Sequence, residues 1–404
     1  MSAEQARVER DTRSGPLAGL RVVDLTVARA GPTCSRQLAD LGADVVHVGN
    51  PLRGGLAGSD NHNLHRGKRS VLLDLKSEGG HAAFLRLARD ADVLVENYRA
   101  GVKHRLRIDY ESLREHNPRL VYASISGFGQ QGPYRDRPGF DLVAQGMGGL
   151  MSVTGPPGQG PWRAGIAISD TASGTFLTQG VLAALFARER TGRGQWVHTS
   201  LLESMVNFMD FQATRWLIDG EVPGQAGNDH PTIFPMGTLA TRDGHINVAA
   251  VMGWQRFLAA IDAEEIDDDP RFCDDTLRSR NREALQQVLE RKLACRTSAE
   301  WTEILNAVDI PCGPVYAMDE VFADPQVVHL NLTRSVEHAS DGTVEVLRHP
   351  VTLSETPTGV SSAAPVPGAH TREVLAECNF TPAEIDALVE SGAAACEGRG
   401  TLFG

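Results

Sequence analysis

One aspartate has the chemistry and the local setting of a covalent nucleophile. Asp170 stands where an apolar, strand-like run gives way to small residues, and a helix-like segment follows at 175–188. A carboxylate at such a junction can lie beside helix N-terminal amides while it faces a cleft, and it can attack an activated acyl group. The same pattern fits an N-cap for the following helix. Local sequence alone favours the cap, because caps are far commoner than nucleophiles, and leaves the nucleophile open.

A glycine-rich segment follows a strand predicted at 120–126. Gly127–Gly132 matches G-x-G-x-x-G, which in a dinucleotide-binding domain leads directly into a helix. Pro133 and Pro138 lie in the segment that follows instead, so no helix can begin there and we reject the dinucleotide interpretation. A glycine loop that closes over a ligand remains open.

A compact basic cluster, His65–Ser70, precedes a strand predicted at 71–75, and Lys76 follows that strand. Guanidinium and ammonium groups can bind the phosphates of a ligand even in an acidic protein. A solvated loop explains the cluster equally well, so both interpretations stay open. Neither a G-x-S-x-G serine elbow nor a histidine pattern typical of a metal site occurs, and we expect no metal ion.

The bulk composition limits the partners of the protein. Its 404 residues carry a formal net charge of −12, which argues against nucleic acid and anionic membranes. No apolar run approaches the roughly 18 residues that a membrane span needs, and residues 1–15 are too polar for a secretory signal. The scattered cysteines form no C-x-x-C pair, which favours reduced thiols. We therefore expect a cytoplasmic protein.

Strands and helices alternate in the first half of the chain. Short turns join an amphipathic helix that ends at Leu41 and another at 109–115 to their neighbouring strands. Such β–α–β units predict a doubly wound parallel sheet, and hence the α/β fold class. Strands are expected at 20–27, 45–48, 71–75, 93–97 and 120–126.

The second half has a different pattern. A polar stretch at 219–228, rich in glycine and proline, predicts a linker, and 236–251 beyond it predicts a β-hairpin with Asp243-Gly244 at its turn. Helices are expected at 254–261, 281–293, 298–308 and 381–390, the last with a Thr381–Glu384 capping box. We predict three parts: a large domain over 1–220, a smaller α+β domain over 221–335 and a return to the large domain over 336–404.

Taken in order, these segments resemble the class III coenzyme A transferase family, also called the carnitine-dehydratase/bile-acid-inducible family, with the formyl-CoA transferases and α-methylacyl-CoA racemases as relatives. The resemblance extends from Leu17 to Leu388. Each matching fragment is short, but together and in this order they are specific. The fragments are Gly19–Leu25, Ala30–Pro32, Leu38–Val45, Gly67–Ser70, Leu73–Lys76, Ala91–Asn97, Ser126–Gly129, Gly132–Tyr134, Thr191–Gln195, Asp243–Gly244, Asp269–Phe272 and Pro311–Val315.

The resemblance implies a role for Asp170, because this residue falls on the family's catalytic aspartate. Such a carboxylate attacks an acyl-CoA donor to give a mixed anhydride, and the released thiolate then forms an aspartyl-CoA thioester. Acyl-CoA is then a substrate, and no permanently bound cofactor is expected. The resemblance also places CoA along Ala28, Ala30, Leu73, Lys76, Asn97, Tyr98, Arg105 and Leu106, with Arg137 near a phosphate.

Three positions depart from the family pattern. Gly49-Asn50-Pro51 lacks a glutamate or basic residue found in many transferases, and Arg53 is a candidate substitute for a phosphate contact. Arg29 replaces a glutamine found in some members, and a cation there could hold a dicarboxylate. Val248–Gly253 lacks the glycine run of some formyl-CoA transferases, so formate and oxalate chemistry are less expected.

Two other functions compete with CoA transfer. A racemase of the same fold moves a proton with a His-Asp pair, but Phe140 precedes Asp141 here, and a phenyl ring cannot carry a proton. A non-catalytic CoA-binding protein is disfavoured, because Asp170 keeps its Asp-Thr-Ala-Ser-Gly context. We therefore favour a transferase over both alternatives.

The family also implies a quaternary structure and a substrate class. Its subunits form an interlocked homodimer, and the long strand-and-loop segment at 320–370 is consistent with that. The expected partners are an acyl-CoA of the succinyl or acetyl type, a small carboxylic acid and a second copy of the chain. Arg29 and the family favour a short dicarboxylate as the acid, such as succinate, malate, mesaconate, itaconate or citramalate.

Overall fold

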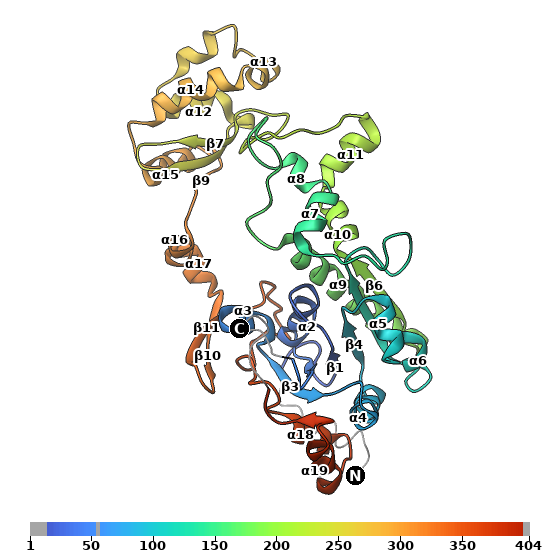
Figure 1. Cartoon of the computed structure of the whole chain (residues 1–404). Coiled ribbons are helices and arrows are strands. Elements are labelled where there is room, and N and C mark those ends of the chain that lie inside the picture. Colours follow the sequence, from blue (N-terminus) through green and yellow to red (C-terminus); the bar gives the residue numbers. More distant parts are fainter. Residues whose placement is uncertain (1–13, 54–56, 399–404) are drawn as a thin grey trace. The chain divides into compact units, whose positions relative to one another are not determined.

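The structure is a computed structural model that describes residues 14–53 and 57–398 (Figure 1). Most of segment 1–15, on which the secretory-signal expectation rests, lies outside the described residues. The chain divides into two compact units: unit 1 comprises 1–149, 165–213 and 331–404, and unit 2 comprises 150–164 and 214–330. Within the described ranges, no helix combines the length and apolar character that crossing a bilayer requires.

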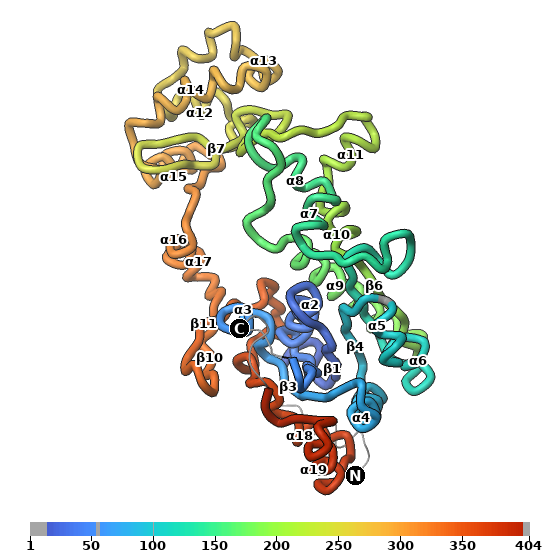
Figure 2. Tube along the Cα trace, in the orientation of Figure 1, coloured from blue at the N-terminus to red at the C-terminus, as the bar shows by residue number. Residues whose placement is uncertain are grey.

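Unit 1 is built on one sheet, whose strand order in the described part is β12-β3-β2-β1-β4-β5-β6. The first six strands of the chain are parallel, and β12 pairs antiparallel with β3 at the edge. Figure 2 shows how the C-terminal end of the chain, in red, returns to this edge. The strands are β1 (Arg21–Asp24), β2 (Asp44–Gly49), β3 (Lys68–Leu73), β4 (Val93–Glu96), β5 (Val121–Ser126), β6 (Trp196–Ser200) and β12 (Ala394–Ala395).

Both faces of this sheet are covered, because successive strand residues point to opposite sides. Val22 and Val45 pack in one buried cluster with α2 (Ala30–Asp40) and α9 (Ile168–Thr191). Their neighbours Val23 and Val46 pack in another, with α4 (Glu78–Arg89), α6 (Tyr110–Arg114), α18 (Thr371–Glu377) and α19 (Pro382–Glu390). The α/β class with a large parallel sheet is confirmed, and the two layers of helices make it doubly wound.

Other elements of unit 1 lie around this sandwich. They are α3 (Gly58–His65), α5 (Ala100–Arg105), α7 (Asp141–Met147), α10 (Leu201–Phe208), and the hairpin of β10 (Thr333–His338) and β11 (Gly342–Leu347). The chain passes between the units through α11 (Asp210–Asp219) and its continuation.

Unit 2 contains a three-stranded antiparallel sheet in its described residues. The predicted hairpin is confirmed: β7 (Met236–Ala240) pairs with β8 (His245–Ala249), and β8 also pairs with β9 (Cys312–Pro314). A buried cluster that includes Phe234, Trp254 and Phe257 joins the sheet to the helices. The helices described in unit 2 are α8 (Leu150–Val153), α12 (Trp254–Ala260), α13 (Asp275–Arg280), α14 (Arg282–Leu293), α15 (Ser298–Ala307), α16 (Met318–Ala323), α17 (Pro325–Leu330) and the short helices η1 (Val251–Gly253) and η2 (Glu264–Asp268).

Two local predictions have opposite outcomes. The strand-like run before Asp170 is not a strand: Ile166 is 62% exposed, and α9 already begins at Ile168. The capping box of α19 is confirmed, because Thr381 Oγ1 accepts the Glu384 N–H while Glu384 accepts the Thr381 N–H. Apolar alternation over so few residues cannot distinguish a strand from a loop that enters a helix.

Candidate active site

The strand order creates a crevice at the carboxyl edge of the sheet. From β1 the chain runs outward to β2 and β3, and it then crosses back to β4 on the other side of β1. Ligands of open α/β sheets bind at such a switch point. Asn97 follows β4, and its side chain joins the loop after β4 to the loop after β1. Its Oδ1 accepts the Val27 N–H at 3.0 Å, and its Nδ2 donates to the Val27 carbonyl at 2.7 Å. Ala28, which follows Val27, has a left-handed φ of 62°, a backbone conformation that residues other than glycine rarely adopt.

Asp170 lies at this edge, in the first turn of α9. The N-cap interpretation of Asp170 is wrong, because Ala167 occupies the N-cap position and Asp170 is the third helical residue. The amide of Ser169 is satisfied from outside the helix: Asp141 Oδ1 accepts the Ser169 N–H at 2.9 Å and its hydroxyl at 2.7 Å. Among the described residues, none forms a hydrogen bond with the Asp170 carboxylate, which is therefore available for chemistry.

The surroundings make this carboxylate more basic than an exposed one. Burial and, to a lesser degree, the charge of Asp141 raise the pKa of Asp170 from 3.8 to about 6, against the opposing charge of Arg29. Desolvation disfavours the charged form of an acid. At neutral pH the group is still mostly ionised, and it is a better nucleophile than an ordinary aspartate.

Close packing of α2 against α9 fixes the position of Asp170. Gly174 makes this approach possible, since a Cβ there would lie 2.7 Å from both the Ala30 carbonyl oxygen and the Thr33 Cβ. Gln37 Nε2 donates to Thr175 Oγ1 at 3.0 Å across the same contact. The start of α2, with Arg29 at its N-cap, is thereby held beside the start of α9.

The glycine loop after β5 has its two ends in contact. A Cβ on Gly127 would lie 2.7 Å from the Gly139 Cα, so both positions need glycine. Within the loop, Gln130 Oε1 accepts from the buried Lys103 Nζ at 2.7 Å, and that ammonium also pairs with Glu96 at 3.0 Å. The loop is thus tied to the end of β4 and to α5.

The residues that the resemblance assigns to coenzyme A lie at the carboxyl ends of strands or in the segments that follow them, but their side chains differ in access. Ala28, Asn97 and Tyr98 lie in the loops after β1 and β4, and Ala30 is the first residue of α2. Lys76, Arg105 and Leu106 line one pocket of about 290 Å³. Two assigned side chains are buried, Leu73 at 1% and Ala30 at 5% exposure, so only their backbones could contact a ligand.

Two further arginines flank the switch point. On the glycine loop, the exposed guanidinium of Arg137 stacks on the ring of Tyr134, with Arg137 Cζ 3.7 Å from the ring centroid. Arg53 is exposed in the segment that follows β2, and its charge opposes the rise to about 12 that burial causes in the pKa of Tyr98. Arg53 is thus available as the substitute phosphate contact.

The basic cluster His65–Ser70 is neither a solvated loop nor an open phosphate site. Arg66 and Lys68 are buried at 1% and 2% exposure, and they pair with Asp40 at 2.7 Å and Asp24 at 2.9 Å. Both interpretations were wrong because β3 begins at Lys68 and carries the cluster into the interior. The cations balance buried carboxylates below the crevice.

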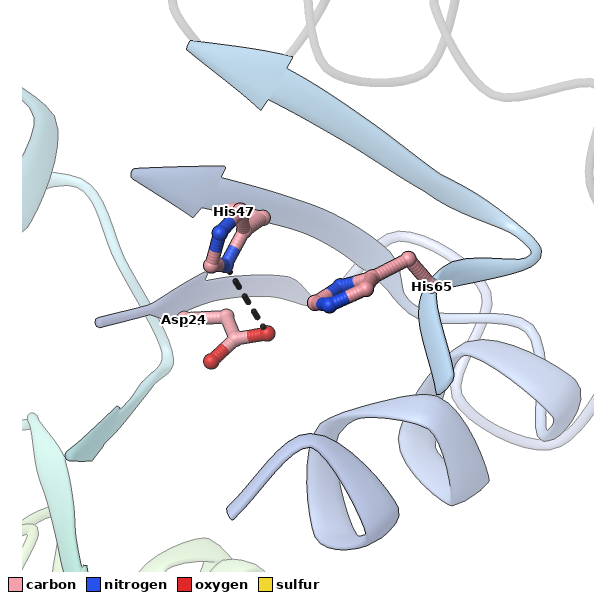
Figure 3. A group of neighbouring side chains, drawn as sticks. All are labelled: Asp24, His47 and His65. Atoms are coloured by element: carbon pink, nitrogen blue, oxygen red, sulfur yellow. Dashed lines mark ion pairs between the residues drawn. The ribbon is translucent and has the colours of Figure 1, made fainter. Parts of the chain in front are cut away.

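Asp24, His47 and His65 converge from β1, β2 and α3 (Figure 3). His47 Nδ1 lies 3.4 Å from Asp24 Oδ2. The Lys68 ammonium is 2.9 Å from the same oxygen and 3.4 Å from His65 Nδ1, so it already supplies the positive charge that a metal ion would bring. Burial and Lys68 hold the pKa of His65 well below its ordinary value. The charges of this cluster therefore balance one another within the interior.

Three residues that position the site through hydrogen bonds and ion pairs were not identified from the sequence. Asp60 pairs with Arg29 at 2.7 Å, Lys103 ties the glycine loop, and Ser169 holds Asp141. Their partners lie 31, 27 and 28 positions away in the chain, and no local pattern marks them.

Comparison with known proteins adds an independent set of findings. A model of the family described as CoA-transferase family III matches residues 17–371. The chain is 36% identical over 390 residues to the succinate–glutarate CoA-transferase of Agrobacterium fabrum, covering 90% of this chain and 96% of that protein. It is also 36% identical over 331 residues to the acetyl-CoA:oxalate CoA-transferase of Acetobacter aceti, covering 79% of this chain and 85% of that protein.

The fold has a close counterpart among solved structures. The crystal structure of a CAIB/BAIF family protein from Brucella suis superposes with a TM-score of 0.83 at 34% sequence identity. The match covers 91% of this chain and 100% of that one. Sequence and fold comparisons therefore agree over most of the chain.

Proposed function

The chain belongs to CoA-transferase family III, and on that premise we propose that it moves CoA from an acyl-CoA donor to a short carboxylic or dicarboxylic acid through Asp170. The donor is a succinyl-CoA or acetyl-CoA type of thioester. CoA itself is a substrate, and the proposal includes no permanently bound cofactor.

The proposed exchange keeps the acyl groups activated at every step. The Asp170 carboxylate attacks the thioester carbonyl, the C–S bond breaks, and a mixed anhydride and CoA thiolate form. The thiolate then attacks the aspartyl carbonyl, which releases the donor acid and leaves an aspartyl-CoA thioester. The acceptor carboxylate attacks this thioester, and the released thiolate takes the acceptor acyl group and frees Asp170. Covalent catalysis of this kind divides one difficult exchange into easier steps.

The observation that carries the proposal is the state of the Asp170 carboxylate. It is half-buried in the first turn of a helix, its pKa is about 6, and the described residues leave it without a hydrogen bond. Asp141, by contrast, is engaged by Ser169 and by Gln145 Nε2 at 2.6 Å. A racemase would need a mobile His-Asp proton pair, but Phe140 is 72% exposed and cannot carry a proton. These features support nucleophilic chemistry over proton exchange.

The coenzyme is proposed to lie along the carboxyl edge of the unit 1 sheet. Cationic side chains at the pocket of Lys76 and Arg105, with Arg137 and Arg53 nearer the glycine loop and Tyr98, suit a ligand with several phosphates. Loop amides after β5 would stabilise the oxyanions of the exchange, at roughly 3 kcal/mol per donor.

Arg29 supports a dicarboxylate as the acid, because it is the N-cap of α2, whose start packs on α9 close to Asp170. The two relatives described above are named for glutarate and oxalate, which are both dicarboxylates. Oxalate therefore belongs among the acids to test, although the segment 248–253 lacks a glycine run. We further propose an interlocked homodimer in the cytoplasm, in keeping with the family resemblance and the acidic composition.

One assay tests the proposed function. The protein is incubated with succinyl-CoA or acetyl-CoA and a panel of acids, namely glutarate, succinate, malate, mesaconate, itaconate, citramalate and oxalate, and new CoA esters are identified by mass spectrometry. We expect at least one dicarboxylate to receive CoA, and D170A to abolish the transfer. Failure with every acid, together with exchange of the α-proton of an acyl-CoA in deuterated water, would contradict the proposal and indicate a racemase.

A further inference from the structure

Arg29 already holds a carboxylate in this structure. Its Nη2 lies 2.7 Å from both Oδ1 and Oδ2 of Asp60, which is on α3. An arginine carries five N–H donors and binds carboxylates best through two nitrogens of its fork. Asp60 uses only one nitrogen, and within the described residues no other acceptor bonds to this guanidinium. The fork thus keeps free donors for a second anion.

The Arg29–Asp60 pair is accessible from solvent. The side chain of Asp60 is 52% exposed and that of Arg29 is 30% exposed. Exposed ion pairs of this kind are weak, so a competing carboxylate can replace one partner at little cost. A buried pair such as Lys68–Asp24 could not exchange in this way.

Asp60 is held in place from its own helix. His62, two residues further along α3, has its Nε2 2.9 Å from the Asp341 carboxylate in the turn between β10 and β11. His62 and His338 also contact edge to face, with ring centroids 4.7 Å apart. The helix that carries Asp60 is therefore anchored independently of Arg29.

The location of Arg29 relates this pair to the reacting group. It caps α2, whose first turn packs on α9 at Gly174, four residues after Asp170. An acid that reacts at Asp170 through one carboxylate would bring a second carboxylate toward Arg29. A monocarboxylate would bring none.

We propose that Asp60 is an exchangeable counterion that tunes the selectivity for dicarboxylates: Arg29 binds Asp60 in the free protein and turns its fork to the distal carboxylate of the substrate. This inference rests on the proposed function, since it presumes an acid that reacts at Asp170. Asp60 is a positioning residue, because it acts through Arg29 and touches no reacting atom. Its negative charge opposes the second carboxylate, so it sets how strongly dicarboxylates are preferred.

The test compares the KM of one dicarboxylate with that of the monocarboxylate of equal chain length, glutarate and valerate, with acetyl-CoA as donor. D60N removes the competing charge but keeps an acceptor oxygen for Arg29. We expect D60N to lower the KM for glutarate by about two- to five-fold, the factor that corresponds to an exposed ion pair, and to leave the KM for valerate and both kcat values close to wild type. R29Q should raise the KM for glutarate and reduce its advantage over valerate.

Two variants serve as controls. D60E restores the charge and should return the glutarate-to-valerate ratio of KM values toward wild type. D90N removes an equal charge at the C-terminal end of α4, at the opposite edge of the sheet, and should leave the ratio unchanged. The inference is overturned if D60N changes both KM values equally, or raises the KM for glutarate. A wild-type protein that transfers CoA to no acid at all contradicts the proposed function instead, which is a different result.

Discussion

The Asp141 carboxylate accepts both the backbone N–H and the hydroxyl of Ser169 through the same oxygen, at 2.9 and 2.7 Å. Because Ser169 directly precedes Asp170, the first residue of α7 fixes the start of α9 at the nucleophile. The same contact keeps a negative charge close to Asp170 and contributes to its raised pKa. One side chain thus positions the reacting group and adjusts its protonation.

The first prediction concerns the pH dependence of transfer. The acid limb of kcat/KM should reflect the Asp170 pKa of about 6 if ionised Asp170 attacks the donor. D141N keeps an oxygen for Ser169 but removes the neighbouring charge, so the acid limb should move to lower pH. S169A leaves the charge of Asp141 in place and should not move the limb downward, although it should reduce stability by about 1 kcal/mol. An unchanged limb in D141N would contradict this electrostatic role.

The second prediction concerns the free energy of unfolding, which the burial of the ionised Asp170 carboxylate lowers. Its folded pKa is raised to about 6 from 3.8, so the unfolded chain releases this proton first. The cost is absent well below pH 3.8, grows as the pH rises toward 6, and is constant above that. D170N should therefore raise the free energy of unfolding at pH 8 by about 1 to 2 kcal/mol, with a much smaller gain at pH 4. Urea unfolding at both pH values measures this. A D170N protein that is less stable than wild type at pH 8 would show that the burial of Asp170 is not costly.

The third prediction tests the helix contact beneath the site. G174A would place a Cβ 2.7 Å from the Ala30 carbonyl oxygen, so α2 and α9 must separate. We expect a loss of about 1 to 3 kcal/mol in stability and a lower kcat, because the start of α9 moves relative to Arg29. G165A is the matched control, since its Cβ would meet nothing within 4 Å. Equal effects of G165A and G174A would rule out this explanation.

The fourth prediction concerns the coenzyme pocket. K76A and R105A each remove a cation that lines the pocket, so each should raise the KM for acyl-CoA by about ten-fold without raising the KM for the acid. Arg114 is an exposed arginine that pairs with Glu111 on α6 and does not line this pocket, and R114A should leave both KM values unchanged. Steady-state kinetics with each substrate varied in turn distinguishes these outcomes. A rise in the KM for the acid alone would place the coenzyme elsewhere.

The parallel strands and the hairpin could be predicted from the sequence, because runs such as 93–97 and turns such as Asp243-Gly244 carry local information. The sheet order is that of dinucleotide-binding folds, yet the G-x-G-x-x-G segment follows β5 and closes on Gly139 instead of opening a helix. The prolines that follow the glycine segment were thus sufficient to exclude the dinucleotide interpretation, and the structure has no helix between Gly127 and Gly139.

The charge pairs could not be predicted in this way. Arg66 with Asp40, Lys68 with Asp24 and Arg29 with Asp60 join residues that only the fold brings together. A basic run in a sequence does not reveal which of its members point inward, so the pattern at 65–70 predicts a surface feature where the structure has buried cations. The start of α9 could not be predicted for the same reason, since Asp141, 28 residues earlier, accepts the N–H of Ser169 in its first turn.

The most direct measurement is the identification of the acylated residue. The protein is incubated with acyl-CoA, treated with hydroxylamine, digested and analysed by mass spectrometry, with D170N as the control. A nucleophilic Asp170 should appear as its hydroxamate in the peptide that contains residues 168–175, and D170N should show neither this product nor CoA transfer. Transfer that proceeds while Asp170 stays unmodified, or that persists in D170N, would contradict the proposed role of this carboxylate.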